Sequence, residues 1–364
     1  MNFPTSYSEI LERIEQIDVE AYGRTRNFKN GAVSNLSPYI SRGIISTKFV
    51  YDNIKASGAS FHAAEKFLQE LAWRDYWQLL WLVKGNAIFK DLKHKQSPVM
   101  SHAMPRAILE AKTGIKAIDE ALITIKETGY MHNHMRMYVA SIVCNIAQTH
   151  WKVGADWMYS QLLDGDLASN YLSWQWVAGT NSNKKYYANQ ENINKFFGTD
   201  QSGTFLDTSY DALPNMELPD VLAERSEFEL KTDLSHLETD DITPSTLSLI
   251  HTYYNIDYQK NKTKQIQNIL LLEPEHFKRY PVTQHCIDFT LKLAKNMDGI
   301  KIFVGAFDEL LELLGEENII FKEHPTHQHF KGNRLERDWM TSIKGDFPSF
   351  FKFWNKAKKE LSYE

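Results

Sequence analysis

Cysteine is scarce in this chain of 364 residues, which carries only Cys144 and Cys286. Two cysteines cannot hold a four-cysteine iron–sulfur cluster or a framework of disulfides, and both lie in apolar segments, so we expect buried free thiols. The sequence also has no apolar run of 18 residues and no apolar segment near its start, which predicts a cytoplasmic protein without a membrane span. Phosphate-binding loops of the P-loop or GxGxxG type are missing as well.

Charge is unevenly distributed along the chain. Residues 1–200 contain 22 Lys and Arg against 19 Asp and Glu, whereas the remaining residues contain 19 against 27. The first part is therefore the better candidate for contact with a polyanion, although so small an excess is common in domains that bind no nucleic acid. Aromatic residues make up 13% of the chain, which suits either well-filled cores or surfaces that stack planar rings.

The pattern of apolar residues predicts a mainly α protein with a small C-terminal α/β unit. Residues 61–85, 113–129 and 131–151 show helical spacing, and Gly85 stands where a helix is expected to end. From 266 on, short apolar runs alternate with helical patterns in the order β-α-β-α-β, and an aromatic-rich helix follows over 347–361. The expected domains are a helical domain over 1–198, an acidic linker over 199–262 and the α/β unit with its last helix over 263–364.

A helix face that carries Asn133 and Arg136 is the first candidate for chemistry. The two residues are separated by three positions on a largely apolar helix, and a buried charge needs a partner. Asp164 or Asp166 in the turn DGDLASN is the expected partner. The pair could line a ligand or simply tie the helix to the loop, and either aspartate could also cap the following helix.

Three further patterns have a structural and a functional interpretation. Ser34, Asn35 and Ser37 precede a helix and suit either a phosphate or ordinary helix caps. The tryptophans at 73, 77 and 81 share one helix face, which is more typical of a core than of a stacking platform. The histidines of the HPTHQH segment (324–329) fit no helix-borne zinc motif, and we expect an exposed loop there.

Taken together, these segments resemble the FAD-binding helical domain of the photolyase/cryptochrome family. The resemblance covers about residues 20–190 and rests on LSPYISRG, ELAWRDYW, KTG…IDEAL, TGYMHNHMRM, W…GADWMYSQLLDGDLASN and WQW. It implies FAD as the cofactor and UV-damaged DNA as the partner. The usual N-terminal antenna domain of the family is expected to be missing, because the chain starts almost directly at the FAD domain.

The resemblance assigns two sets of residues to ligands. The set implied to bind FAD is Tyr22, Ser34, Asn35, Leu36, Ser37, Phe67, Arg74, Asn133, Arg136, Asp164, Asp166 and Asn170. Within it, Arg136 and Asp164 would pair beside the isoalloxazine, and Asn170 would face flavin N5. The set that stands where cyclobutane-dimer photolyases contact damaged bases is Glu70, Trp73, Asn133, Met137 and Trp176.

Electron transfer and DNA binding follow from the same resemblance. Trp174 and Trp151 match the inner two members of the family's tryptophan chain, and Ile108 occupies the position of the outer one. The positions implied to bind DNA phosphates are Arg26 and Arg74. After WQW the chain departs from the family's pattern, and Lys184 and Lys185 are expected to compensate there by binding DNA. His134 stands where the family usually has an arginine, and the altered phosphate contacts suggest a preference for single-stranded or distorted DNA.

The leading hypothesis is therefore a deoxyribodipyrimidine photolyase, in which reduced FAD excited by blue light splits cyclobutane pyrimidine dimers by electron transfer. The alternative is a cryptochrome-like photoreceptor without repair activity, in which the acidic C-terminal part acts as an effector. A third interpretation is a degenerate FAD-binding protein with a structural role, which the preserved set of lesion-contact residues disfavours.

Overall fold

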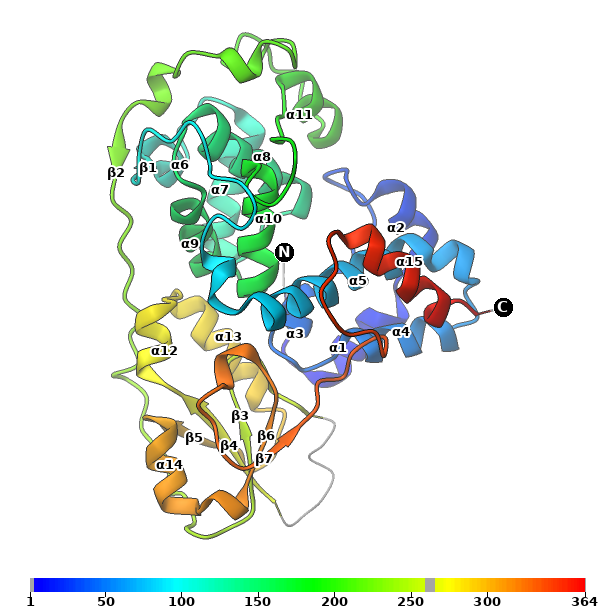
Figure 1. Cartoon of the computed structure of the whole chain (residues 1–364), viewed down its shortest axis with the longest axis vertical. Coiled ribbons are helices and arrows are strands. Elements are labelled where there is room, and N and C mark those ends of the chain that lie inside the picture. The colour runs from blue at the N-terminus through cyan, green and yellow to red at the C-terminus, as the bar shows by residue number, and fades with distance from the viewer. Residues whose placement is uncertain (1–2, 259–265, 364) are drawn as a thin grey trace. The chain divides into compact units, whose positions relative to one another are not determined.

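The computed structural model describes residues 3–258 and 266–363 (Figure 1). The described residues are mainly helical and include a five-stranded parallel sheet in the C-terminal part. Two compact units divide the chain. The first consists of Glu20–Val33 and Val83–Glu229, and the second of Asn2–Val19, Ser34–Leu82 and Leu230–Glu364. None of the described helices is long and apolar enough to cross a membrane.

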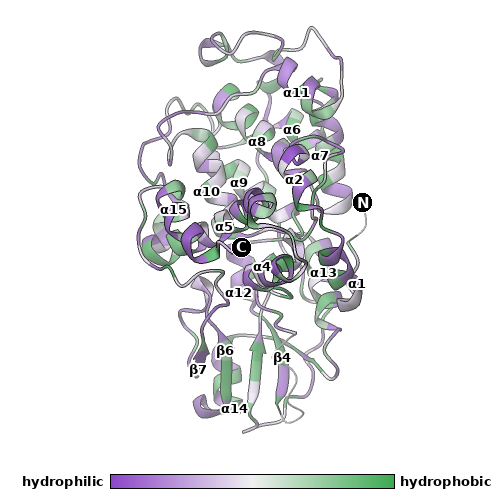
Figure 2. Cartoon of the chain, turned by 90° about the vertical axis from the view of Figure 1, so that its right-hand side faces the viewer, coloured by the Kyte–Doolittle hydropathy of each residue, from purple (hydrophilic) through white to green (hydrophobic). Residues whose placement is uncertain are grey.

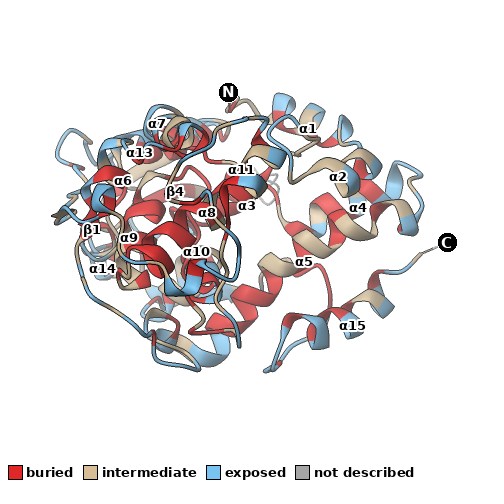
Figure 3. Ribbon diagram, turned by 90° about the horizontal axis from the view of Figure 1, so that it is seen from above, coloured by how far each residue is buried: buried red, intermediate tan, exposed pale blue. Residues whose placement is uncertain are grey.

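The first unit is a helical bundle with one short antiparallel strand pair. Its elements are α2 (Val19–Thr25), η1 (Gly85–Phe89), β1 (Met104–Pro105), α6 (Arg106–Glu110), α7 (Lys116–Thr128), α8 (Asn133–Ser141), η2 (Ile142–Ile146), α9 (Trp151–Gln161), α10 (Leu167–Ala178), α11 (Gln190–Phe197), η3 (Leu213–Asn215), η4 (Asp220–Leu222) and β2 (Arg225–Ser226). Figure 3 shows that α8, α9 and α10 are largely buried. Cys144 is fully buried and free, as expected.

The single helix predicted over 131–151 is wrong, because the helix is interrupted between Ile146 and Trp151. The α-helix α8 ends at Ser141 and continues as one turn of π-helix, η2. Gln148 then adopts a left-handed conformation with φ of 51°, and His150 caps a new helix that begins at Trp151. The side chain of Gln96 stabilises the break, since its amide donates to Thr149 O at 2.9 Å and its Oε1 accepts from Trp151 N at 2.8 Å.

The second unit combines four helices from the first part of the chain with the parallel sheet. Its elements are α1 (Tyr7–Glu15), α3 (Ser37–Ser41), α4 (Thr47–Ala56), α5 (Phe61–Lys84), β3 (Ser248–His251), β4 (Gln267–Leu272), α12 (Pro274–Arg279), α13 (Gln284–Ala294), β5 (Lys301–Val304), α14 (Phe307–Leu314), η5 (Glu316–Asn318), β6 (Ile319–Lys322), η6 (Pro325–His327), β7 (Asn333–Leu335) and α15 (Phe350–Leu361). The helix α5 ends at Gly85, whose φ is 53°, as the sequence predicts.

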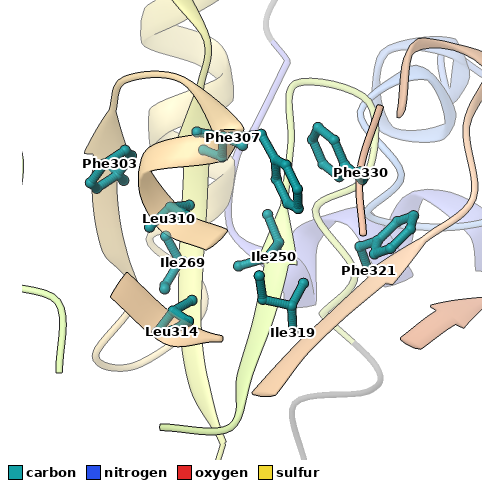
Figure 4. Close-up of a cluster of buried hydrophobic side chains, with 10 residues drawn as sticks. Ile250, Ile269, Phe303, Phe307, Leu310, Leu314, Ile319, Phe321 and Phe330 are labelled. Atoms are coloured by element: carbon teal, nitrogen blue, oxygen red, sulfur yellow. The ribbon is translucent and has the colours of Figure 1, made fainter. Parts of the chain in front are cut away.

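The sheet has the strand order β5-β4-β3-β6-β7, and all of its neighbouring strands are parallel. Buried side chains from its strands, from α14 and from the loop before β7 form one core, which Figure 4 shows: Ile250, Ile269, Leu271, Phe303, Phe307, Leu310, Leu314, Ile319, Phe321 and Phe330. The apolar residues of β6 stand out in the hydropathy colouring of Figure 2. Strand β3 lies upstream of residue 263, where the sequence placed the start of the α/β unit.

Two of the three histidines of the HPTHQH segment are buried, contrary to expectation, whereas the side chain of His329 is 52% exposed. His324 and His327 are each only 6% exposed. The ring of His324 stacks on Tyr254 with the centroids 4.5 Å apart, and that of His327 stacks on Phe330 at 4.6 Å. The sequence pattern misleads here because an imidazole, once neutral, packs between rings as another aromatic side chain does.

Candidate functional site

Arg136 and Asp164 form a largely buried ion pair in the first unit. Arg136 Nη2 lies 2.9 Å from Asp164 Oδ2, and the two side chains are 19% and 5% exposed. Arg136 Nε also donates to the carbonyl of Met131 at 2.8 Å, which fixes the plane of the guanidinium. The structure thus selects Asp164 as the partner that the sequence left open between two aspartates. A fixed, nearly dry pair of opposite charges can orient a polar ring system placed beside it.

Asp166 has the other role that the sequence allowed, because it caps α10. Its Oδ1 accepts a hydrogen bond from Ser169 N at 2.7 Å. Asn170, one turn further on, donates from its amide nitrogen to the carbonyl of Ala155 on α9 at 2.8 Å. The Oγ atom of Ser169 is buried and has no hydrogen-bond partner within the described part of the chain.

Trp151 belongs to helix α9, and Trp174 of α10 packs against the same helix. Trp151 is its first residue and is fully buried, while the ring of Trp174 covers Gly154, one turn along. The indole Nε1–H of Trp151 donates to Asp91 Oδ1 at 2.7 Å. Sequence reasoning missed Asp91, since a contact across 60 residues leaves no periodic signal. Ile108, at the predicted outer position of the chain, is buried and aliphatic.

Trp176 is the most exposed tryptophan among the residues considered for the site, with 38% of its surface accessible. The chain that follows it lines an open pocket of about 350 Å³. The lining residues are His94, Lys95, Ser97, Ala178, Gly179, Ser182, Asn183, Lys184 and Lys185. Two of the four basic residues there, Lys184 and Lys185, were predicted to bind DNA; His94 and Lys95 were not. Lys185 Nζ donates to Ser97 O at 2.7 Å, and burial lowers its pKa.

Other predicted DNA contacts in this unit are less available. The Nη1 of Arg26 donates to the carbonyl of Gly23 in the preceding helix α2, at 2.9 Å. His134 is 7% exposed, its Nδ1 lies 3.1 Å from the carbonyl of Asn27, and burial lowers its pKa. A neutral, buried imidazole cannot replace the phosphate-binding arginine that the family has there.

Tyr22 and Met137 are half-buried, and Asn133 is exposed at the start of α8.

The segment Ser34–Ser37 belongs to the second unit and leads into the five-residue helix α3. Asn35 adopts a left-handed conformation with φ of 53°, which asparagine tolerates better than most residues. Its Oδ1 atom is buried without a hydrogen-bond partner among the residues that the structure describes. Leu36 is buried, whereas Ser34 and Ser37 are half-buried. A buried amide oxygen without a donor is a costly feature that a bound ligand would relieve.

Helix α5 carries the remaining predicted residues. Phe67 is 2% exposed. Glu70 forms an ion pair with Lys66, in which Oε1 lies 2.9 Å from Nζ. Arg74 donates from Nη2 to the hydroxyl of Ser41, so it links α5 to α3. These contacts order the polar face of α5 within the second unit.

Trp73, also on α5, is half-buried and is stacked on Phe350 of α15. Trp77 and Trp81, its partners in the helical stripe, are buried, which confirms the core interpretation for them.

The chain is similar to known proteins over about half of its length. A sequence profile described as the FAD-binding domain of DNA photolyase matches residues 67–240. A deoxyribodipyrimidine photo-lyase of Alkalihalophilus pseudofirmus is 27% identical over 209 residues, which cover 54% of this chain and 42% of the relative. A cryptochrome DASH of Danio rerio is 28% identical over 212 residues, covering 55% and 41%. Residues 67–240 of this chain therefore form an FAD-binding domain of the photolyase/cryptochrome family.

A solved structure supports the same assignment. The cryptochrome of Synechocystis sp. superposes with a TM-score of 0.50 at 26% identity, over 54% of this chain and 44% of that one. The match thus spans less than half the length of these relatives. The Oδ1 of Asn35, in the second unit, and the Oγ of Ser169, in the first, are buried polar atoms that a polar ligand of each unit could satisfy.

Proposed function

We propose that this chain binds FAD and, under blue light, repairs cyclobutane pyrimidine dimers in DNA. When bound and reduced, the flavin would supply the electron that splits the dimer. The relatives support the cofactor more firmly than the reaction, because photolyases and cryptochromes DASH match equally well. The proposal of repair rather than signalling therefore rests on the residues of this chain that would contact DNA.

The observation that carries the proposal is the position of Trp176. A large indole left 38% exposed at the end of α10 offers a face on which a base can stack, and stacking of this kind contributes about 1–3 kcal/mol per base. The basic pocket follows directly in the chain, with Lys184 and Lys185 on its lining. An aromatic platform next to a cluster of cations matches the two halves of a nucleotide, the base and the phosphate.

Each unit offers polar groups for the lesion, the second unit on α5 and the first unit on α8. The carboxylate of Glu70 and the amide of Asn133 can bond to the carbonyl and imino edges of pyrimidines, and Met137 adds an apolar contact. Arg136 and Asp164 would fix the flavin ring by hydrogen bonds, with the amide of Asn170 beside it. Asn35 would satisfy its buried oxygen by accepting a hydrogen bond from the cofactor.

The decisive experiment uses the full chain loaded with FAD, reduced chemically without oxygen and mixed with an oligonucleotide that contains a thymine dimer. Illumination with blue light should restore the ultraviolet absorbance of the separated thymines. Trp176→Ala should reduce repair and DNA binding while the flavin content stays unchanged, whereas Tyr210→Ala, at another exposed aromatic residue, should change neither. An unmodified dimer after illumination, with flavin bound and reduced, would exclude repair.

We further propose a preference for single-stranded DNA. The guanidinium of Arg26 donates to the carbonyl of Gly23 and His134 is buried, so fewer cations remain for a duplex backbone. Affinity for single strands should then fall with salt. Replacing both Lys184 and Lys185 by alanine should lower the slope of that salt dependence by about 0.7 for each phosphate that is no longer neutralised. Equal repair of single- and double-stranded substrates would contradict the preference.

The contact of Phe350 with Trp73 favours a second candidate, a cryptochrome-like photoreceptor. One face of a predicted lesion-contact ring is already covered by a residue of the same chain. A photoreceptor needs no such platform, and α15 would then be part of the effector. Light-dependent protease cleavage after residue 200, with no repair, would support this function over the first.

A further inference from the structure

The predicted tryptophan chain consists of Trp174 and Trp151 and has no tryptophan at its outer position. The first unit supplies a different aromatic residue close to Trp151. Ile108 cannot act as an electron donor, because an aliphatic side chain is not oxidised by an indole radical. Trp151 is fully buried, so it has no direct contact with solvent either. If Trp151 is oxidised, its electron must be replaced through a neighbouring side chain.

Tyr171 is that neighbour. Its ring lies edge-on to the ring of Trp151, with the centroids 6.1 Å apart and the planes at 86°. Tyr171 is 2% exposed and lies on α10 one turn before Trp174, while Phe89 contacts its ring at 5.2 Å. Two oxidisable rings that lie edge to face and are both buried allow an electron to pass without an intervening solvent gap.

The phenol of Tyr171 also has a proton acceptor within hydrogen-bond distance. Its hydroxyl donates a hydrogen bond to Asp156 Oδ1. The side chain of Asp156 is 41% exposed and is paired with Lys152 at 2.7 Å, so the carboxylate connects a buried phenol to the surface. Oxidised tyrosine is a strong acid and loses this proton, which is why a bonded base is needed for the residue to donate an electron.

We propose that Tyr171 is the outer electron donor of this protein. One electron leaves the Tyr171 phenol and fills the vacancy on oxidised Trp151, and the phenolic proton moves to the Asp156 carboxylate. Trp151 is restored as a neutral indole, and a neutral tyrosyl radical remains. The vacancy reaches Trp151 from Trp174, and the oxidant that creates it is a photoexcited oxidised flavin, so the proposal rests on the proposed function. Asp91, bonded to Trp151 Nε1, keeps the indole oriented.

Transient absorption of the FAD-loaded full chain, oxidised and flashed with blue light, tests this assignment. The wild-type protein should show a tryptophan radical that decays as the tyrosyl band appears. Tyr171→Phe removes one oxygen atom and should abolish the tyrosyl band, prolong the Trp151 radical and slow the accumulation of reduced flavin. Asp156→Asn should do the same to a smaller extent, because the hydrogen bond survives but the base does not. Tyr138→Phe, at another buried and hydrogen-bonded tyrosine, should behave as the wild type.

A tyrosyl band that persists in Tyr171→Phe, or wild-type kinetics in that variant, would overturn the assignment. Absence of any tryptophan radical in the wild-type protein would overturn it too. Repair by the chemically reduced protein separates the two proposals, since it bypasses the donor chain. Tyr171→Phe should then repair as well as the wild type, and a wild-type protein that photoreduces through Tyr171 but repairs nothing would refute only the proposed function.

Discussion

The ring of Phe350 stacks on the ring of Trp73, with the centroids 3.6 Å apart and the planes within 9° of parallel. The two residues are 277 positions apart, and both belong to the second unit. Further contacts hold α15 in place: Lys358 Nζ lies 2.6 Å from Glu65 Oε1, and Tyr51 Oη donates to Leu361 O at 3.0 Å. The last helix is thus an integral part of the structure around α5.

Replacing Phe350 by alanine should lower the free energy of unfolding by about 3–5 kcal/mol, since the side chain is 2% exposed and leaves a cavity beside Trp73. Urea denaturation measures the loss. Phe351→Ala is the matched control, because Phe351 is 61% exposed and should cost less than about 0.5 kcal/mol. Equal effects of the two variants would show that the stack does not hold α15 in solution.

Asp164→Asn should destabilise the first unit and release the flavin. The substitution leaves the guanidinium of Arg136 without its buried counter-ion, which typically costs about 3–5 kcal/mol. Flavin absorbance per protein and thermal denaturation report the two effects. Glu110→Gln alters an exposed ion pair with Arg106 and should leave the flavin content unchanged. If Asp164→Asn binds flavin as tightly as the wild type, the pair does not orient the cofactor.

Gly154→Ala should disturb Trp174. A Cβ atom at this position would lie 2.3 Å from ring atoms of Trp174, so the indole must move or the helices α9 and α10 must separate. Overpacking of this kind costs about 1–3 kcal/mol. Near-ultraviolet circular dichroism should show a changed tryptophan environment, whereas Ser173→Ala, at an exposed position on α10, should not. An unchanged spectrum and melting temperature in Gly154→Ala would contradict this packing.

Acid should weaken the second unit. Burial lowers the pKa of His276 and of His327 to about 3, against about 6.5 in an unfolded chain. Between these values the unfolded state binds more protons, so the free energy of unfolding falls as the pH drops below about 6.5, by up to about 1.4 kcal/mol per pH unit for each histidine.

Urea titrations at several pH values measure this slope. His327→Asn keeps a donor for the carbonyl of Lys322 and removes the titrating group, so it should flatten the pH dependence. The same change at exposed His62 should not. If His327→Asn leaves the pH dependence of the free energy of unfolding unchanged, groups other than His327 cause the acid sensitivity.

Local patterns predicted the elements of this fold well, and contacts distant in sequence escaped them. Helix α5 and the alternation from β4 to β6 follow from apolar periodicity together with glycine at the helix ends. The break at Gln148 does not, because it depends on the side chain of Gln96. Strand β3 was missed, since four residues followed by Thr252 and a tyrosine pair resemble a loop as much as a strand.

The candidate site divides in the same way. The pairing of Arg136 with one of two nearby aspartates was predictable from helical spacing and from the cost of a buried charge. Phe350 on Trp73, Asp91 on Trp151 and Lys95 in the basic pocket were not, because each joins segments that no repeat or motif connects. Tyr171 left a weak signal, an aromatic residue one turn before Trp174, whose importance depends on the position of Trp151.

The order in which the segments of the second unit leave the ribosome has a consequence for its folding. Helix α5 is made early, but the strands that share its unit and the helix that covers Trp73 follow only after the whole of Val83–Glu229 has been synthesised. The helical bundle of the first unit can therefore fold while the apolar face of α5 is still exposed to solvent. A shortened gene that stops at residue 198 would leave that face uncovered for good, and its product should aggregate rather than serve as a minimal flavin domain.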